Sequence, residues 1–128
     1  MVIKKRAFTM IELMGVLLII GTLVAVVAVR VRRGQAQAKV TETKATIESI
    51  KTAVAFYKQD KGKYPTTGEG LKVLVGTGIE KSQLTDGWGS DFEYNAPPVK
   101  HKDKFKNFEI ISYGPDKEES ADDIYDGE

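Results

Sequence analysis

The chain has 128 residues and a formal net charge of +1, which leaves room for one domain with an appended element and does not indicate a polyanionic partner. It contains no cysteine, which excludes disulfides, thiolate nucleophiles and zinc–cysteine sites. His101 is the only histidine and no nucleophile motif accompanies it, so the sequence predicts a protein that is not an enzyme.

Charge is distributed unevenly along the chain. Residues 1–33 carry six Lys or Arg side chains against Glu12, whereas residues 34–115 are close to balanced, with twelve basic and ten acidic side chains. Residues 116–128 carry seven carboxylates against Lys117. This division into a basic N-terminal segment, a balanced central segment and an acidic C-terminal segment predicts that the three segments lie in different environments.

A long apolar run begins near the N-terminus. Phe8–Val29 is 22 residues long and is interrupted only by Glu12, and a helix needs about 20 apolar residues to cross a bilayer. A cleaved secretory signal would have a shorter apolar core followed by small residues, but this run ends in VRVRR, which is a poor cleavage site. Basic residues flank both ends, so charge bias alone does not orient the run. The sequence therefore predicts a membrane-spanning helix.

Glu12 lies about one helical turn inside this apolar run. A charge at the centre of a membrane helix costs about 2.5–3.5 kcal/mol on insertion scales, and less near the interface. The side chain could extend to the lipid headgroups without further consequence, or it could pair with a cation from another chain. The residues themselves leave both interpretations open.

The block KKRAFTMIEL at residues 4–13 resembles the class III leader of type IV pilins and pseudopilins. The resemblance implies that a prepilin peptidase cuts between Ala7 and Phe8 on the cytoplasmic side and that Phe8 becomes an N-methylated amino terminus. It also implies that Glu12 pairs with the terminal ammonium of a neighbouring subunit, and that everything after Arg33 lies outside the cytoplasm. Ala7 departs from the family, which prefers glycine before the cut.

The chain after Gly34 changes from uniformly apolar to amphipathic. Two rows spaced by seven residues follow this change: Val40, Ile47 and Val54, and Thr43, Ile50 and Tyr57. Charged residues flank the rows, so the pattern predicts a helix with one apolar stripe that packs against a small domain rather than in a coiled coil. Joined to the apolar run, the helix would cover about residues 8–60 and stop at Gly62.

Turns and one short helix are predicted after the long helix. Tyr64-Pro65 turns the chain, and Thr66 with Glu69 has the pattern of a capping box before a helix at residues 70–75. The Gly-Thr-Gly that follows at residues 76–78 lacks the Gly-Lys-Ser/Thr of a phosphate loop and is interpreted as a turn.

Two strands are predicted in the second half of the chain. The turn DGWG at residues 86–89 leads into an alternating strand at residues 92–95, and residues 108–113 form the next strand. We expect an antiparallel hairpin over the long helix, with Trp88 as a lid on the small core. The basic segment VKHKDKFK between the strands could bind nucleic acid, but an exposed loop is the preferred interpretation, and no nucleic-acid partner is expected.

Together these elements predict an α+β fold, in which a long N-terminal helix, first transmembrane and then amphipathic, packs against a small antiparallel sheet. The chain would be ladle-shaped, as are the pilins that its leader resembles. Three parts are expected: a cytoplasmic leader at residues 1–7, a transmembrane and assembly helix at residues 8–33, and a periplasmic globular head at residues 34–128 that includes the C-terminal half of the long helix.

The acidic end of the chain is rich in oxygen ligands. The segment from Ser112 to Ile124 contains five carboxylates but lacks the spacing of an EF-hand. Most acidic termini are solvated and self-repelling. However, the Tyr113-Gly114-Pro115 turn could present a carbonyl, and Ile124 and Tyr125 could dock the segment, so a cation site is a second interpretation.

Three further segments narrow the resemblance. Residues 60–71 (DKGKYPTTGEGL), 84–94 (LTDGWGSDFEY) and 111–116 (ISYGPD) are similar in order and spacing to the major pseudopilins of type II secretion systems. This resemblance implies a calcium site in which Asp116 and Asp123 supply side chains and Tyr113 supplies its carbonyl. Asp122 could replace Asp123. Gly87 stands where relatives usually have proline, and a looser turn is expected there.

The resemblance implies a structural subunit that polymerises into the periplasmic pseudopilus of a type II secretion system. Its partners would be further copies in a helical filament, the prepilin peptidase, minor pseudopilins, the inner-membrane assembly platform and membrane lipid. The subunit would lie in the inner membrane with its N-terminus cytoplasmic and its head periplasmic. A type IV pilin or a competence pseudopilin for DNA uptake is the alternative. Surface pilins often close a loop with a disulfide, and the absence of cysteine argues against that class. A membrane-anchored periplasmic enzyme is a further rival, against which the lack of a base–nucleophile pair argues.

Overall fold

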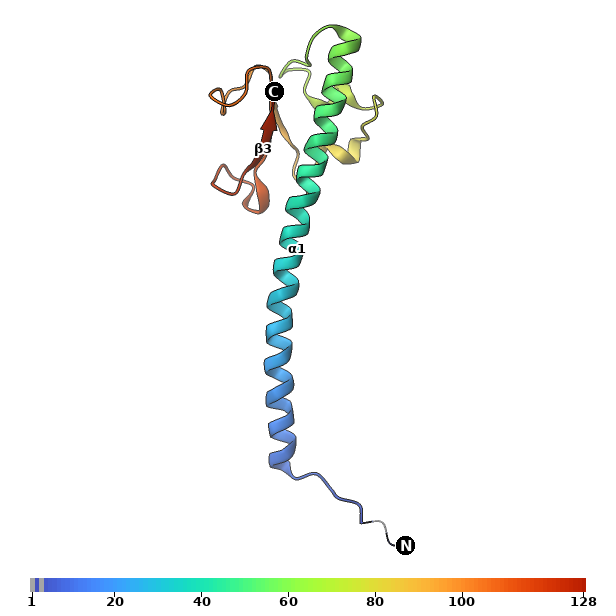
Figure 1. Cartoon of the computed structure of the whole chain (residues 1–128), viewed down its shortest axis with the longest axis vertical. Coiled ribbons are helices and arrows are strands. Elements are labelled where there is room, and N and C mark those ends of the chain that lie inside the picture. The colour runs from blue at the N-terminus through green and yellow to red at the C-terminus, as the bar shows by residue number, and fades with distance from the viewer. Residues whose placement is uncertain (1, 3) are drawn as a thin grey trace. The chain divides into compact units, whose positions relative to one another are not determined.

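The computed structural model describes residue 2 and residues 4–128, and its longest element is one helix. This helix, α1 (Met10–Lys61), has 52 residues, and the elements after it are the 3₁₀ helices η1 (Leu71–Leu74) and η2 (Lys81–Leu84), the strands β1 (Glu93–Asn95) and β2 (Glu109–Ser112), the 3₁₀ helix η3 (Gly114–Asp116) and the strand β3 (Ile124–Gly127) (Figure 1). The chain divides into two compact units, Met1–Ala36 and Gln37–Glu128, and we call the second unit the head. The predicted long helix is confirmed, with its ends displaced by at most two residues.

The N-terminal unit is an apolar helix with exposed side chains. From Met10 to Val31 the large apolar side chains have exposed fractions between 47% and 78%. No proline interrupts α1, so its backbone groups bond to one another throughout, as lipid requires. By length and composition this helix can cross a membrane. The unit thus carries an apolar surface that it does not bury by itself.

The second half of α1 forms one wall of the core of the head. Its buried residues recur at intervals of three and four, which places them on one face of the helix: Thr43, Ile47, Ile50, Ala53 and Val54. The other core side chains come from the rest of the head: Leu71, Leu74, Ile79, Phe92, Tyr94, Phe108 and Ile110. The predicted apolar stripe therefore packs against a small domain, as expected.

Three antiparallel strands form the sheet, in the order β1-β2-β3. Tyr94 pairs with Ile110 across β1 and β2, and Ile111 pairs with Tyr125 across β2 and β3. The predicted hairpin and the α+β fold class are confirmed, but β3 was not predicted. The acidic end of the chain is therefore not wholly a solvated tail, because part of it closes one edge of the sheet.

Glycine ends α1 as the sequence predicts. Gly62 adopts φ +74° and its N–H donates to the Lys58 carbonyl at 2.7 Å, which is how a left-handed residue closes a helix. Thr66 and Glu69 do exchange hydrogen bonds, at 2.8 and 3.2 Å between the backbone nitrogen of each and the side chain of the other. Their capping box closes a turn, however, and the short 3₁₀ helix η1 begins after Gly70. The prediction of a helix capped by Thr66 at residues 70–75 is corrected accordingly.

The turn at residues 86–89 is packed tightly against α1. The Gly87 N–H donates to the Thr43 hydroxyl at 2.9 Å, and a Cβ at Gly87 would lie 2.8 Å from the Lys39 carbonyl oxygen. Only glycine combines this close approach with a free N–H donor. The expectation of a looser turn was therefore wrong. Trp88 is half buried and lies outside the hydrophobic core of the described residues, so it is not the lid that the sequence suggested.

Candidate assembly segment and acidic loop

The Ala7–Phe8 bond, where the resemblance to class III leaders implies cleavage, lies in exposed non-helical backbone. Both residues are exposed, and α1 begins two residues later at Met10. Exposed backbone outside helices and strands is accessible to a peptidase. The predicted leader at residues 1–7 includes Met1 and Ile3, which lie outside the described residues.

Glu12 forms a capping box with Thr9 at the start of α1. The Thr9 N–H donates to Glu12 Oε2 at 3.0 Å, and the Glu12 N–H donates to Thr9 Oγ1 at 3.3 Å. These two bonds satisfy donors that a helix start otherwise leaves free, and a carboxylate there also faces the positive end of the helix dipole. Sequence reasoning missed this cap, although the T-x-x-E pattern at residues 9–12 was its signal.

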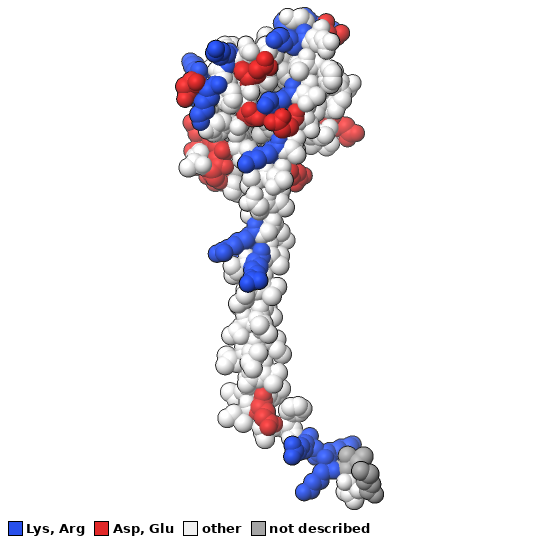
Figure 2. Space-filling model, in the orientation of Figure 1, with Lys and Arg blue, Asp and Glu red and all other residues white. Residues whose placement is uncertain are grey.

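An uncharged surface separates this carboxylate from the basic groups farther along the helix. Figure 2 shows basic side chains at the N-terminal end, then one acidic patch near the start of the helix, then a surface without charge, and then further basic side chains. Arg30, Arg32 and Arg33 supply those later charges. Glu12 is therefore the one charged residue between Arg6 and Arg30 in the sequence, and its side chain accepts one local hydrogen bond.

Three aspartates of the acidic loop, which we define as residues 113–123, converge on Ser120. Its hydroxyl lies 2.8 Å from Asp116 Oδ2 and also contacts Asp122 Oδ1, and its N–H donates to Asp123 Oδ1 at 3.2 Å. One hydroxyl has a single proton and cannot donate to both carboxylates. The loop thus gathers more negative oxygens than its own donors satisfy.

The donor chemistry of the acidic loop fits a hard cation. The Glu118 N–H, followed by the Ser120 hydroxyl, lowers the pKa of Asp116, which keeps this carboxyl ionised. Within the described residues no three His, Asp or Glu side chains are grouped so as to hold a metal by themselves. A cation bound by Asp116 and Asp123 would therefore also need backbone oxygens, which calcium accepts.

Tyr113 directs its side chain away from these aspartates. Its hydroxyl contacts Glu93 and Lys100, and the Lys100 ammonium also pairs with Glu119 at 3.1 Å. The structure thus places Asp116 and Asp123 in contact with the same residue, Ser120. The carbonyl of Tyr113 remains a predicted ligand, and its side chain is engaged elsewhere. The next residue, Gly114, has φ +69°, and a Cβ there would lie 3.1 Å from Asp122 Oδ2.

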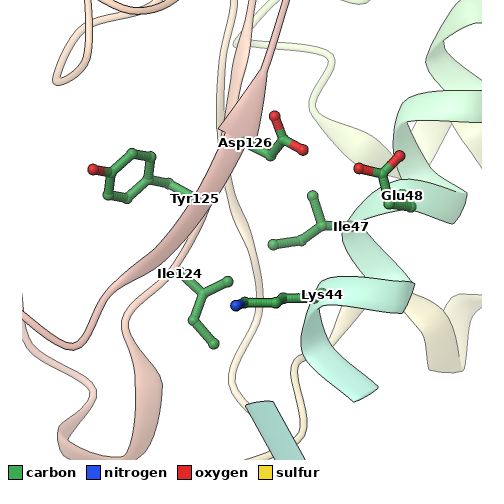
Figure 3. Close-up of a pocket in the computed structure, with 6 residues that line it drawn as sticks. All are labelled: Lys44, Ile47, Glu48, Ile124, Tyr125 and Asp126. Atoms are coloured by element: carbon green, nitrogen blue, oxygen red, sulfur yellow. The ribbon is translucent and has the colours of Figure 1, made fainter. Parts of the chain in front are cut away.

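Strand β3, which follows the acidic loop, is held to α1 by mixed contacts. Lys51 Nζ pairs with Asp126 Oδ2 at 2.9 Å. Figure 3 shows the shallow pocket between the two elements, in which Ile47 of α1 and Ile124 of β3 lie near the ends of the Lys44 and Glu48 side chains. The pocket is small, and three of its six lining residues are charged, so we assign no ligand to it.

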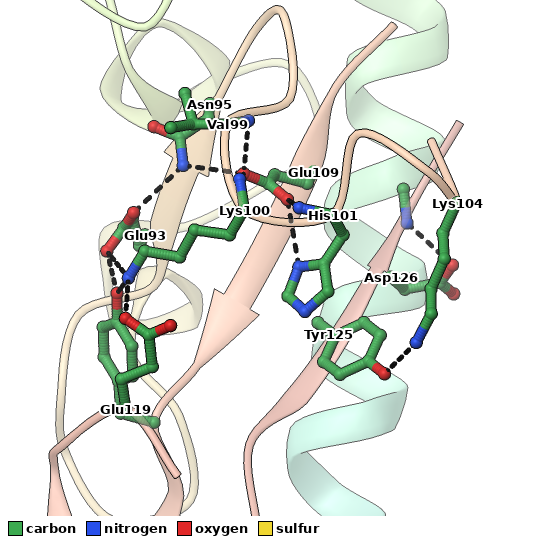
Figure 4. A network of polar contacts seen from close by, with 12 residues as sticks. Glu93, Asn95, Val99, Lys100, His101, Lys104, Glu109, Glu119, Tyr125 and Asp126 are labelled. Atoms are coloured by element: carbon green, nitrogen blue, oxygen red, sulfur yellow. Dashed lines mark hydrogen bonds and ion pairs between the residues drawn. The ribbon is translucent and has the colours of Figure 1, made fainter. Parts of the chain in front are cut away.

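Sequence reasoning also missed Glu109, a fully buried carboxylate. Its oxygens accept hydrogen bonds from the backbone N–H groups of Val99, Lys100 and His101 at 2.8–2.9 Å and from the Asn95 side chain at 3.0 Å (Figure 4). Burial alone would raise the pKa of Glu109, but these donors outweigh burial and lower the pKa to about 2. The basic segment, predicted as an exposed loop, has exposed lysines but a backbone that is pinned to this carboxylate.

His101 carries this network on to β3. Its Nδ1 lies 3.0 Å from Glu109 Oε2, and its ring stacks on Tyr125 with centroids 3.8 Å apart. The Lys104 ammonium also contacts the Tyr125 hydroxyl. His101 therefore has a structural partner on each side.

Comparisons with known proteins match most of the length of this chain. A family model described as "Type II secretion system (T2SS), protein G" matches residues 30–126, and a "Prokaryotic N-terminal methylation motif" matches residues 3–28. The type II secretion system core protein G of Pseudomonas aeruginosa is 35% identical, over 94% of this chain and 90% of the relative. Those of Klebsiella pneumoniae and Escherichia coli K12 are each 30% identical over 94% of this chain, and the matches cover 93% and 88% of the relatives.

The fold is also that of a solved pseudopilin. The crystal structure of the major pseudopilin from the type 2 secretion system of enterohaemorrhagic Escherichia coli superposes with a TM-score of 0.59 at 22% identity, covering 73% of this chain and 90% of that one. The family model alone spans more than half of the chain. With its N-terminal methylation motif, its long helix and its three-stranded sheet, the chain belongs to the protein G family of type II secretion systems, the major pseudopilins.

Proposed function

We propose that this chain is a structural subunit, not an enzyme, that polymerises into the periplasmic pseudopilus of a type II secretion system. The observation that carries the proposal is the pair of matches, to the protein G family over residues 30–126 and to the N-terminal methylation motif over residues 3–28. The protein G match favours secretion over the alternative of a type IV pilin or a competence pseudopilin. The exposed apolar helix supports polymerisation, because lipid and neighbouring helices can each cover such a surface.

Glu12 would join one subunit to the next. After cleavage between Ala7 and Phe8, the new ammonium group of one subunit would lie against the Glu12 carboxylate of its neighbour. Opposite charges 4 Å apart attract by about 4 kcal/mol at an effective dielectric of 20. Removing one partner leaves the other charge buried and unpaired, which is strongly destabilising. The pair would therefore set the register of the filament as well as its strength.

Two variants separate this charge pair from the local cap. Glu12→Gln keeps an oxygen that can accept the Thr9 N–H but removes the charge, whereas Thr9→Ala keeps the charge and removes the hydroxyl half of the cap. We expect both proteins to enter the membrane and Glu12→Gln to lose filaments, as counted by electron microscopy, while Thr9→Ala retains more of them. Wild-type numbers of filaments from Glu12→Gln would contradict the proposal.

Removal of residues 1–7 and methylation of Phe8 belong to the same proposal. The exposed, non-helical backbone at Ala7–Phe8 supports it. Intact-mass measurement of protein from a host that contains the peptidase should show loss of residues 1–7 and the mass of one added methyl group. Ala7→Gly, the residue that the family prefers, should be processed at least as completely. Uncleaved chain in that host would contradict this part of the proposal.

The topology and partners follow from assembly at the inner membrane. The leader at residues 1–7 would face the cytoplasm, the helix at residues 8–33 would span the membrane, and the head at residues 34–128 would be periplasmic. The partners would be the prepilin peptidase, further copies, minor pseudopilins, the assembly platform and lipid. In cells without the peptidase, protease added to spheroplasts should digest a C-terminal tag and spare an N-terminal one, and the reverse pattern would contradict this topology.

Calcium would bind in the acidic loop, held by the side chains of Asp116 and Asp123 and by the Tyr113 carbonyl. The convergence of three aspartates on one serine supports the site, since a divalent cation would offset their repulsion. A ligand whose free concentration is a hundred times its dissociation constant stabilises the folded state by about 2.7 kcal/mol. Bound calcium would also hold the chain that leads into β3.

Chelation tests the site. We expect a chelator to lower the melting temperature of the head in the wild type but not in Asp116→Asn, because only the wild type has calcium to lose. Asp103→Asn is the matched control, since Asp103 is an exposed carboxylate on another loop, and it should respond as the wild type does. A melting temperature that does not depend on calcium in any of the three proteins would contradict the proposed calcium site.

A further inference from the structure

A buried polar path begins at the acidic loop and enters the interior of the head. The Gly114 N–H donates to Ser112 Oγ at 3.3 Å, and the Ser112 hydroxyl donates its own proton to Asp86 Oδ2 at 2.6 Å. Ser112 is fully buried and Asp86 is 6% exposed. Because the proton on Ser112 is committed to Asp86, its oxygen is left facing the Gly114 amide.

Asp86 also shapes the turn that packs against α1. Its Oδ1 accepts the Trp88 N–H at 3.0 Å and the Ser90 N–H at 2.9 Å. Gly87, which lies between Asp86 and Trp88, donates its N–H to the Thr43 hydroxyl on α1 at 2.9 Å. Thr43 is fully buried, and its hydroxyl donates in turn to the Lys39 carbonyl at 2.8 Å.

At its other end the path meets an aspartate of the acidic loop. A Cβ at Gly114 would lie 3.1 Å from Asp122 Oδ2 and 3.3 Å from the Asp122 carbonyl oxygen. Asp122 therefore fills the space beside Gly114, and side-by-side residues in a packed interior do not shift independently. Cation binding at the next residue, Asp123, that moves Asp122 toward Gly114 would displace Gly114, and with it the Ser112 hydroxyl.

The geometry points to Asp86 as a positioning residue that couples the acidic loop to α1, so that a cation in the loop and the docking of the Trp88 turn on Thr43 stabilise each other. This inference rests on the proposed calcium site. Linked binding is reciprocal: if calcium strengthens the turn–helix contact, then weakening that contact must lower calcium affinity by the same factor. A role confined to stability of the turn would leave calcium affinity unchanged.

The full chain offers its own reporter for this coupling. Trp88 is the only tryptophan and is half buried within the turn itself. Calcium titrated into the wild-type chain in detergent micelles should shift Trp88 emission, with the same dissociation constant that calorimetry measures. In Ser112→Ala, which breaks the path beside the loop, the emission shift should be lost or reduced although calcium still binds.

The decisive variant lies on α1, at the far end of the path from the acidic loop. Thr43→Val removes the acceptor of the Gly87 N–H and should weaken calcium binding about fivefold or more, within the usual range of coupling between sites. Thr41→Val is the matched control, because Thr41 makes the same type of bond to the carbonyl four residues before it but is exposed. Its calcium affinity should equal that of the wild type.

The outcomes separate the inference from the calcium site itself. Calcium binding with wild-type affinity in Thr43→Val, or an unchanged Trp88 emission on binding, overturns the coupling and leaves the site in place. Absence of calcium binding in the wild type overturns both. If Ser112→Ala does not fold, the difference in calcium affinity between Thr43→Val and Thr41→Val still tests the coupling.

Discussion

The two halves of α1 have similar backbones and opposite surroundings. In Met10–Ala36 large apolar side chains are exposed, as Leu17 is at 59%, whereas in Gln37–Lys61 the apolar stripe is buried, as Ile50 is at 0%. The first half is apolar on all sides and the second on one face only. A helix that is apolar all round needs an environment from outside the chain, and one with a stripe finds its partner within the chain. The pattern of apolar residues, more than their number, separates the two.

The largest expected effect tests this contrast directly. Ile110→Ala in the core should destabilise the head by about 2–5 kcal/mol, because it removes buried methylene groups and leaves a cavity. Leu17→Ala, a comparable truncation of an exposed side chain, should leave the unfolding of the head unchanged. Chemical denaturation followed by Trp88 fluorescence measures both. Equal losses of unfolding free energy in the two variants would contradict the contrast between the two halves of α1.

The buried carboxylate of the head should make the next largest contribution. The pKa of Glu109 is lowered from 4.5 to about 2, which corresponds to about 3 kcal/mol of stability above pH 4.5. A depressed pKa stabilises the fold above the unfolded value, so this contribution should be lost as the pH falls from about 4.5 through about 2.

The measurement is the free energy of unfolding of the wild type and of Glu109→Gln across that pH range. The two proteins should differ most above pH 4.5 and converge toward pH 2. Glu42→Gln, at an exposed position on α1, serves as the control and should follow the wild type throughout. A difference between wild type and Glu109→Gln that does not depend on pH would rule out the ionised carboxylate as its source.

A smaller and more local effect is expected at the start of α1. Loss of a helix N-cap costs about 1 kcal/mol, so Thr9→Ala should speed amide hydrogen exchange in the first turn about fivefold without changing the melt of the head. Thr22→Ala removes a hydroxyl that bonds only to the Ile19 carbonyl, within the same apolar surface. It should leave exchange at the first turn unaltered, and equal acceleration in both variants would argue against the cap.

The smallest effect concerns the ion pair between α1 and β3. Lys51 and Asp126 are partly exposed, so a double-mutant cycle with Lys51→Met and Asp126→Asn should give a coupling of about 0.2–1 kcal/mol that falls with added salt. A coupling well above this range would mean that the pair is more shielded from solvent than its exposure indicates.

The long helix and two of the strands could be predicted because their patterns are long or strongly alternating. Strand β3 could not, since its two apolar or aromatic residues, Ile124 and Tyr125, are adjacent rather than alternating and lie between acidic neighbours. Its pairing with β2 is a tertiary contact that no local pattern encodes.

The burial of Glu109 could not be predicted for a different reason. Alternation along β2 places Glu109 on the face opposite Ile110, which would be open to solvent in a simple two-layer fold. All four residues of β2 are buried, however, because the backbone of residues 99–101 covers this second face. By contrast, Asp116 and Asp123 are near neighbours in sequence, so their approach could be expected from chain connectivity alone.

The cap at Thr9 leaves Glu12 with capacity for a second partner. Oε2 holds the Thr9 amide, and within the described residues no hydrogen bond occupies Oε1. A carboxylate can therefore receive an incoming amine on one oxygen while the other keeps the helix start closed. With the proposed pairing of Glu12 and a neighbour's terminal amine, joining the filament would require no unwinding of the first turn of α1, so a subunit could enter or leave with this helix intact.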